Sequence, residues 1–397
     1  MPNPHSIATS TLTLRNFNLP QKIPAHQKSW QDFLKTPPAF AQEPFTASTA
    51  EIERFAQKKF SALLILGIGG STLAPQTLIQ ALSPQKRPIY FLETPDSAQF
   101  HAVLQKVNLP TLGVVVISKS GQTLETLTQF FALLPKLQKT NLCLLAAPTD
   151  NFLAKFAAKN QLPFFALPPK IDGRFAACTP VGLLPAALAG LKITQILQGA
   201  RAVAPQRAFQ FACRQAALYH QNKSIAVLCS YSPKLAKFGE WWTQLLAESL
   251  GKIASNGKRV GLTPVNSLGP AAQHSSLQLW LAGPRDKFFL FLNVASAQSE
   301  VTLGDQLPPE FSFLSGKNFR AIRQAEFEAT TQVLIQAQLP LTKIALSELT
   351  EYSLGQLFQF FLLTTYFLGK MLSVEPFGQP AVEAGKKLAC AKLKAKK

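Results

Sequence analysis

Short apolar runs alternate with segments of helical periodicity along most of this chain. Residues 46–170 contain LLILGIG, PIYFLE, GVVVISKS, NLCLLAA and FFAL, and residues 205–372 contain SIAVLCSY, KFFLFLNVA and KIALSEL. Such alternation is typical of βαβ units, in which parallel strands form a sheet and helices cover its faces. The 397 residues also exceed the ~150 of an average domain. The sequence therefore predicts an α/β protein with two lobes, each a parallel sheet flanked by helices.

Three segments lie outside the two predicted lobes. Residues 1–45 have scattered prolines and weak periodicity, so we expect them to wrap around the surface. Residues 171–204 are rich in Pro and Gly, and we expect them to connect the lobes and form part of a cleft wall. Residues 373–397 are expected to form a C-terminal helix with a basic tail.

The stretch from Tyr352 to Leu372 is apolar and long enough to suggest a membrane span. Two Gln and two Thr side chains interrupt it, and a helix that is apolar all round is also typical of a protein core. We therefore expect a buried helix in the second lobe and no membrane partner.

The charge balance raises the question of an anionic partner. The formal net charge is +19, from 40 Lys and Arg against 21 Asp and Glu, and such an excess is found in proteins that bind nucleic acid. Here the basic residues are scattered, and the only dense run is Lys386–Lys397, without a basic-aromatic stripe or zinc-knuckle spacing. We therefore expect no nucleic-acid partner, an expectation that strong salt-dependent binding to DNA would contradict.

The cysteines indicate the compartment. They are odd in number, lie far apart and include no CxxC pair, which favours reduced, buried thiols over disulfides or a metal site. They are Cys143, Cys178, Cys213, Cys229 and Cys390. The first twenty residues lack the continuous apolar core of a signal peptide. We expect a cytoplasmic protein without a bound metal.

Two polar turns follow predicted strands of the first lobe and precede helical segments. They are GIGGST, residues 67–72, and SKSGQT, residues 118–123. In open parallel sheets, ligands bind beyond the carboxyl ends of the strands, where helix N-termini present free N–H groups. Neither turn has the Walker pattern of a nucleotide site. We therefore expect a sugar phosphate to be held there. The candidate residues are Gly70, Ser71, Ser118, Lys119, Ser120 and Thr123.

Six segments, in the same order along residues 60–390, resemble the motifs of the glucose-6-phosphate isomerase family. They are GIGGS, ISKSGQTLET, DGRFAACTPVGLLPAALAG, WWTQLLAESLGK, the QH of AAQHSSLQLW, and EPFGQPAVEAGKK. The resemblance implies two sugar-isomerase (SIS) lobes. It also implies interconversion of glucose 6-phosphate and fructose 6-phosphate in glycolysis and gluconeogenesis, without metal or organic cofactor. The family further implies a homodimer with shared active sites.

The resemblance also assigns roles to individual residues. It implies that Glu248 moves a proton between C2 and C1 through a cis-enediol, which requires one carboxylate above that face of the sugar. It implies that Arg174 stabilises the enediolate and that His274 and Lys386 open the sugar ring. Gly173, Gln244 and Gln379 match positions that contact the substrate. The alternative is a catalytically silent sugar-phosphate-binding SIS protein, for which loss of Glu248 or His274 would be expected.

The chain departs from the family pattern at three positions near these motifs. EPFGQPAVE has Gly378 where an Asp commonly precedes the Gln, and Ala381 where a Gly commonly follows the Pro. DGRF has Asp172 in place of the usual Gly. Asp172 lies two residues before the motif's Arg174, so its carboxylate would either hold that guanidinium or partly neutralise it, and the sequence leaves both open.

Overall fold

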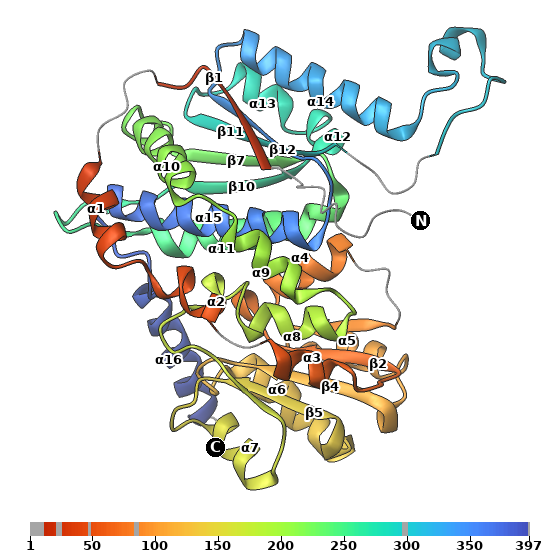
Figure 1. Ribbon diagram of the computed structural model, residues 1–397, viewed down its shortest axis with the longest axis vertical. Helices are drawn as coiled ribbons and strands as arrows, with labels where there is room; N and C mark the ends of the chain where they lie inside the picture. The colour runs from red at the N-terminus through yellow and green to blue at the C-terminus, as the bar shows by residue number, and fades with distance from the viewer. Residues whose placement is uncertain (1–11, 21–25, 47–48, 83–86, 296–300, 396–397) are drawn as a thin grey trace.

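The computed structural model describes residues 12–20, 26–46, 49–82, 87–295 and 301–395. Two five-stranded sheets lie at opposite ends of the molecule, with helices packed between them (Figure 1). The first sheet is entirely parallel, in the order β3-β2-β4-β5-β6. Its strands are β2 (Ala62–Leu66), β3 (Ile89–Leu92), β4 (Leu112–Ile117), β5 (Leu142–Ala146) and β6 (Phe164–Ala166). All five were predicted from the apolar runs of the first lobe.

The second sheet has the order β1-β12-β11-β7-β10. Its strands are β1 (Leu12–Phe17), β7 (Ile225–Ser230), β10 (Thr263–Leu268), β11 (Lys287–Val294) and β12 (Leu341–Leu346). The pairs among β7, β10, β11 and β12 are parallel, whereas β1 runs antiparallel to β12. β7, β11 and β12 were predicted. β1 and β10 were not, and β1 brings part of the expected wrapping segment into the sheet of the second lobe.

Helices cover both sheets. In the first half of the chain they are α1 (Gln27–Lys35), α2 (Glu43–Thr46), α3 (Ala50–Ala56), α4 (Leu73–Leu82), α5 (Ser97–Leu104), α6 (Leu124–Leu133), α7 (Phe152–Asn160), α8 (Pro180–Leu188) and α9 (Ile193–Arg201). In the second half they are α10 (Pro205–His220), α11 (Ala236–Leu250), α12 (Gly269–Gln273), α13 (Leu277–Ala282), α14 (Phe319–Gln336), α15 (Glu351–Met371) and α16 (Pro380–Lys394). The predicted α/β fold with parallel sheets and a C-terminal helix is therefore confirmed.

Helix α15 is the central element between the two sheets. It packs against α9, α10 and α11, and nearly all of its residues are buried. The Trp241 ring of α11 meets the Phe358 ring of α15 edge to face, with centroids 4.6 Å apart. This packing confirms the predicted buried helix, and in the described parts of the chain no helix has the length and apolar character needed to cross a bilayer.

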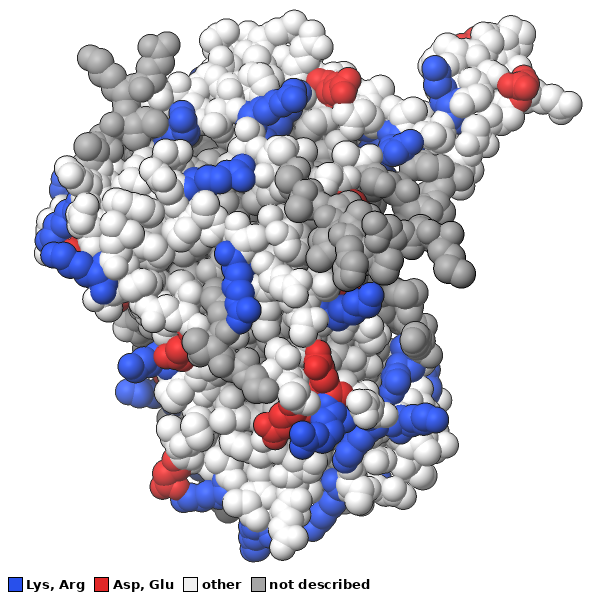
Figure 2. Space-filling view, viewed as in Figure 1, with Lys and Arg blue, Asp and Glu red and all other residues white. Residues whose placement is uncertain are grey.

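The polar surface and most of the cysteines follow the expected distribution. Figure 2 shows the described Lys and Arg side chains spread over the upper and lower lobes of this face. Four of the five cysteines are buried as expected, whereas the expectation is wrong for Cys390, which is exposed because it lies on the exposed helix α16. Burial raises the pKa of the Cys178 and Cys229 thiols to about 12, so both stay protonated at neutral pH. Within the described ranges, no three His, Cys, Asp or Glu side chains form a group that could hold a metal ion.

Candidate active site

The two polar turns lie side by side because they follow neighbouring strands. The GIGGST turn follows β2, the SKSGQT turn follows β4, and β2 and β4 are paired in parallel. In the second turn the hydroxyls of Ser118 and Thr123 are 2.8 Å apart, and Ser120 Oγ accepts the Gln122 N–H at 3.2 Å. Ser118 is buried and Ser120 is exposed. The sheet thus presents hydroxyls and helix N-termini along one edge, as the strand pattern predicted.

The GIGGST turn meets the connecting segment at a backbone-to-backbone contact. Residues Gly69–Ser71 form the 3-10 turn η2, and Gly173–Phe175 form η6. A Cβ on Gly70 would lie 2.5 Å from the carbonyl carbon of Gly173, which no side chain could accommodate without displacing that backbone. The glycine therefore sets how closely the first lobe approaches the turn that carries Arg174.

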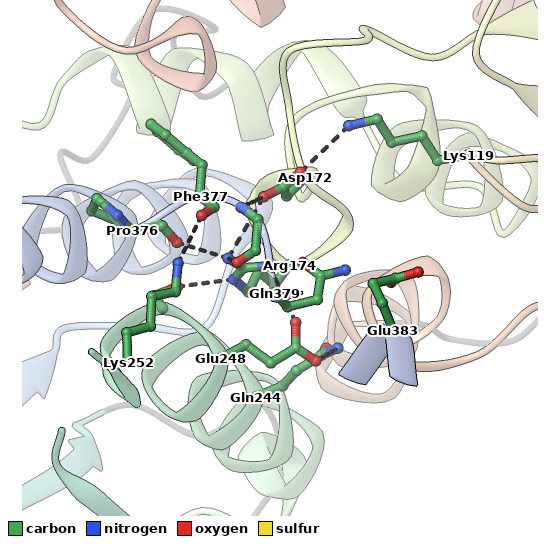
Figure 3. Close-up of polar contacts among 12 residues, drawn as sticks. Lys119, Asp172, Arg174, Gln244, Glu248, Lys252, Pro376, Phe377, Gln379 and Glu383 are labelled. Atoms are coloured by element: carbon green, nitrogen blue, oxygen red, sulfur yellow. Dashed lines mark hydrogen bonds and ion pairs between the residues drawn. The ribbon is translucent and has the colours of Figure 1, made fainter. Parts of the chain in front are cut away.

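Arg174 is fully buried, and all five of its N–H donors are used. Nε donates to Ser249 Oγ at 2.9 Å, and Nη2 donates to the carbonyls of Pro376 at 2.7 Å and Gly378 at 3.0 Å. Nη1 donates to Glu248 Oε2 at 3.2 Å and to Gln379 Oε1 at 2.9 Å (Figure 3). Burial lowers the pKa of the guanidinium, while the nearby carboxylates oppose that shift.

Two cationic side chains, Lys252 and Arg174, bind alternate backbone carbonyls of the C-terminal loop 375–379. Lys252 Nζ donates to the carbonyls of Glu375 and, at 2.7 Å, of Phe377, whereas Arg174 binds the carbonyls of residues 376 and 378. Burial lowers the pKa of Lys252 to about 8, the positive charge of Arg174 adds to the shift, and the surrounding carboxylates oppose it. Four successive carbonyls therefore point at positive charge, which fixes the loop that leads into α16.

Glu248 lies on α11 with one turn of helix between it and Gln244. Gln244 Nε2 donates to Glu248 Oε1 at 2.9 Å, and Arg174 holds Oε2, so both carboxylate oxygens are oriented. The side chain of Glu248 is 31% exposed, unlike that of Arg174. Gln244 also abuts the GIGGST turn, because a Cβ on Gly69 would lie 2.9 Å from its Nε2. The result is an oriented carboxylate, open to solvent, beside a buried cation.

Two of the four candidate catalytic residues are not part of this cluster. His274 follows α12 and is exposed, and its ring makes no hydrogen bond or ion pair to any residue that the structure describes. Lys386 lies on α16, is 62% exposed and pairs with Glu383 at 2.9 Å. The structure therefore brings together Gly70, Gly173, Arg174, Gln244, Glu248 and Gln379, with Lys119 linked to them through Asp172, but leaves His274 and Lys386 apart.

Sequence reasoning missed three residues that support the site. Lys252 and Ser249 lie inside the WWTQLLAESLGK motif, and Trp241 Nε1 donates to the Arg174 carbonyl at 3.1 Å. A buried Trp requires a partner for its indole N–H, so its position in the motif was a usable signal. Nothing in the local pattern indicates that Lys252 binds carbonyls more than 120 residues away.

Comparisons with known proteins show what the chain is similar to. A family model described as phosphoglucose isomerase matches residues 45–397. A glucose-6-phosphate isomerase of Carboxydothermus hydrogenoformans is 35% identical over 379 residues, which cover 87% of this chain and 82% of that protein.

Solved structures share the two-lobed fold. A hypothetical protein of Thermus thermophilus superposes with a TM-score of 0.88 at 30% identity, covering 96% of this chain and all of that one. A glucose-6-phosphate isomerase of Chlamydia trachomatis has a TM-score of 0.73 at 23% identity, over 95% of this chain and 76% of that one, and supports the fold alone. On the extent of the family match and the identity to its relatives, the chain belongs to the phosphoglucose isomerase family.

Proposed function

We propose that this chain catalyses the reversible isomerisation of glucose 6-phosphate and fructose 6-phosphate. The observation that carries the proposal is the oriented, partly exposed carboxylate of Glu248 beside the buried Arg174 guanidinium, at the edge where two phosphate-type turns end. Family membership supports the same conclusion. In this proposal the enzyme acts in glycolysis and gluconeogenesis and works without metal or organic cofactor.

The proposed chemistry uses Glu248 as a base and then as an acid. Its carboxylate removes the proton from C2 of the open-chain aldose, so the C–H electrons form the C1–C2 double bond while the carbonyl electrons move onto O1, which gives the cis-enediolate. The proton of O2 passes to O1, and the same carboxyl returns its proton to C1 as the C2–O bond becomes the ketone carbonyl. Arg174 Nη1 is the donor atom available to the developing oxyanion, because its two partners are side chains rather than backbone carbonyls. A substrate oxygen would replace Glu248 or Gln379 there, which frees the carboxylate for proton transfer.

The phosphate would be held at the edge of the first sheet. Ser118, Ser120 and Thr123 offer hydroxyls, Lys119 offers positive charge, and Gly70 and Ser71 present backbone at the neighbouring turn. The mutual hydrogen bond between Ser118 and Thr123 can be exchanged for bonds to a phosphate oxygen, which accepts several donors at once. In this arrangement Gly173, Gln244 and Gln379 contact the sugar.

Ring opening is assigned to His274 and Lys386, acting in a homodimer with shared active sites. The exposure of both side chains supports a partner surface, because neither meets the Glu248 cluster within its own chain. Residues 301–318 extend away from the body of the second lobe (Figure 1), and Phe311 and Phe313 on this arm are exposed. A second copy of the chain could cover these rings, and we propose that in this dimer His274 enters the partner's cleft. We propose a cytoplasmic location, on the buried, protonated thiols.

A coupled assay of glucose 6-phosphate formation from fructose 6-phosphate tests the proposal. The expected result is turnover in the parent protein without added metal, also after treatment with a chelator. Binding of fructose 6-phosphate without turnover would instead favour the catalytically silent SIS protein.

A further inference from the structure

The Asp172 carboxylate meets three segments of the chain that are far apart in sequence. Oδ1 lies 3.5 Å from Lys119 Nζ, in the SKSGQT turn. Oδ2 lies 3.6 Å from Arg174 Nη2 and accepts the backbone N–H of Gly378 at 2.6 Å. The side chain is 22% exposed, so water screens these contacts only in part. Asp172 thus joins the proposed phosphate turn, the buried guanidinium and the C-terminal loop.

The bond to Gly378 controls the direction of the loop. Gly378 has φ +68°, in the left-handed region that favours glycine, and it directly precedes Gln379, whose side chain reaches Arg174 Nη1. Arg174 binds the Gly378 carbonyl while Asp172 binds its N–H, so both backbone polar groups of this residue are fixed. Without the carboxylate, Gly378 would retain one of these two restraints, and a glycine has the largest backbone freedom to regain.

We propose that Asp172 is a positioning residue of this active site: its carboxylate fixes Gly378, and so sets Gln379 against the Arg174 atom that faces the substrate. The expected change in kcat rests on the proposed function, whereas the expected change in how the loop is held does not. The proposal also explains two of the departures from the family motifs, Asp172 and Gly378, by one contact. The chain has Asp172 where the motif usually has Gly, and Gly378 where it commonly has Asp, and these two residues contact each other. This chain therefore has a carboxylate at the contact between residues 172 and 378, but residue 172 carries it instead of residue 378.

The geometry at both positions permits an exchange of the two residues. Asp172 has φ −69° and ψ 152°, an extended conformation that glycine also adopts. At Gly378 a Cβ would have no heavy atom within 4 Å, and Asp tolerates the left-handed region better than most residues. The variants are Asp172→Gly, Gly378→Asp and the exchanged pair Asp172→Gly/Gly378→Asp. Asp150→Gly is the matched control, because Asp150 is an exposed loop carboxylate of the first lobe whose ion pair, among the described residues, is with the surface Lys155.

Amide hydrogen exchange of residues 375–379 measures how firmly Asp172 holds the loop, and it does so whether or not the protein converts substrate. We expect Asp172→Gly to exchange faster in this loop by about tenfold or more, the exchanged pair to return toward the parent, and Asp150→Gly to match the parent. Parent-like exchange in Asp172→Gly would overturn the proposal. If Asp172→Gly does not fold, Asp172→Ala, which also removes the acceptor of the Gly378 N–H, decides the question: faster exchange in the loop supports the proposal and parent-like exchange overturns it.

Steady-state kinetics read the functional part. We expect kcat to fall about tenfold in Asp172→Gly, which corresponds to one lost hydrogen bond to a charged group. The exchanged pair should recover to within about threefold of the parent, although each single variant is impaired. An exchanged pair no better than Asp172→Gly, or an unchanged kcat and KM in Asp172→Gly, would overturn the proposal. An inactive parent would contradict the proposed function alone, because the exchange measurement still decides how the loop is held.

Discussion

Two groups of candidate residues differ sharply in how the fold holds them. Around Arg174, every donor of the guanidinium has a partner and both oxygens of Glu248 are oriented. His274 and Lys386 are instead exposed, and the one ion pair of Lys386 is to a neighbour on its own helix. The first group is organised by one chain alone, whereas the second is not. On the proposed function, proton transfer depends on residues preorganised within the subunit, and ring opening depends in addition on His274, which we propose the neighbouring subunit supplies.

The largest effect should come from the preorganised group. Glu248→Gln keeps the shape of the side chain and one acceptor for Arg174, but an amide cannot take the proton from carbon. We expect kcat to fall by roughly 10² to 10⁴-fold, with substrate binding retained. Turnover by the coupled assay and binding by calorimetry measure the two separately. Near-normal turnover would show that another group is the base.

The exposed group can be tested by mixing two inactive variants. Glu248→Gln and His274→Ala chains are refolded together in equal amounts. If each site takes His274 from the neighbouring subunit, half of the dimers are mixed and each has one intact site of two, so roughly a quarter of parent activity returns. Native mass spectrometry confirms that mixed dimers form. If mixed dimers form and activity stays absent, His274 acts in the site of its own chain, which contradicts the proposal of shared active sites.

A third experiment addresses the phosphate turn. Ser118→Ala combined with Thr123→Ala removes both hydroxyls of the 2.8 Å pair, one of them buried. Each lost phosphate contact should weaken binding by about 1 to 3 kcal/mol, so we expect KM to rise at least tenfold with a smaller change in kcat. Ser61→Ala is the control, because its hydroxyl bonds Thr111 at the amino end of the sheet. An unchanged KM would place the phosphate elsewhere.

The smallest expected effect concerns Lys252 and pH. Burial lowers its folded pKa to about 8, against 10.5 for an ordinary lysine. Between these two values the unfolded chain binds more protons than the folded one, so stability rises with pH over that window. We expect the melting temperature of the parent, relative to Lys252→Gln, to increase by about 2 °C from pH 7.5 to 10. A decrease over the same range would show that the folded protein keeps Lys252 charged.

Strands inside the sheets were easier to predict from the sequence than the edges of the second sheet. β2, β4 and β11 lie inside their sheets and are buried throughout, so they appear in the sequence as continuous apolar runs. The missed strands of the five-stranded sheets, β1 and β10, are the two edges of the second sheet, whereas β3 and β6, the edges of the first sheet, were predicted. Edge strands face solvent on one side, and β10 also contains Pro264, so neither gives a continuous apolar run. Only tertiary pairing identifies them.

The candidate site could also be predicted only in part, because some of its contacts join distant parts of the chain. The edge position of SKSGQT follows from strand order alone, and the resemblance located Arg174 and Glu248. The contact between Asp172 and Gly378 spans 206 residues, and no local periodicity carries information over that separation. The two departures were visible in the sequence, but their connection depends on how the C-terminal loop folds back.

The loop 375–379 also determines when the site becomes complete. Its partners come from the connecting segment and from the end of α11, which must already be in place before the loop can dock. During synthesis these residues leave the ribosome after the strands of both sheets, because the chain emerges from its N-terminus and domains fold as they emerge. A growing chain can therefore form both sheets while Gln379 is still absent. On the proposed role of Gln379, a product truncated before this loop would keep both sheets but lack a complete site.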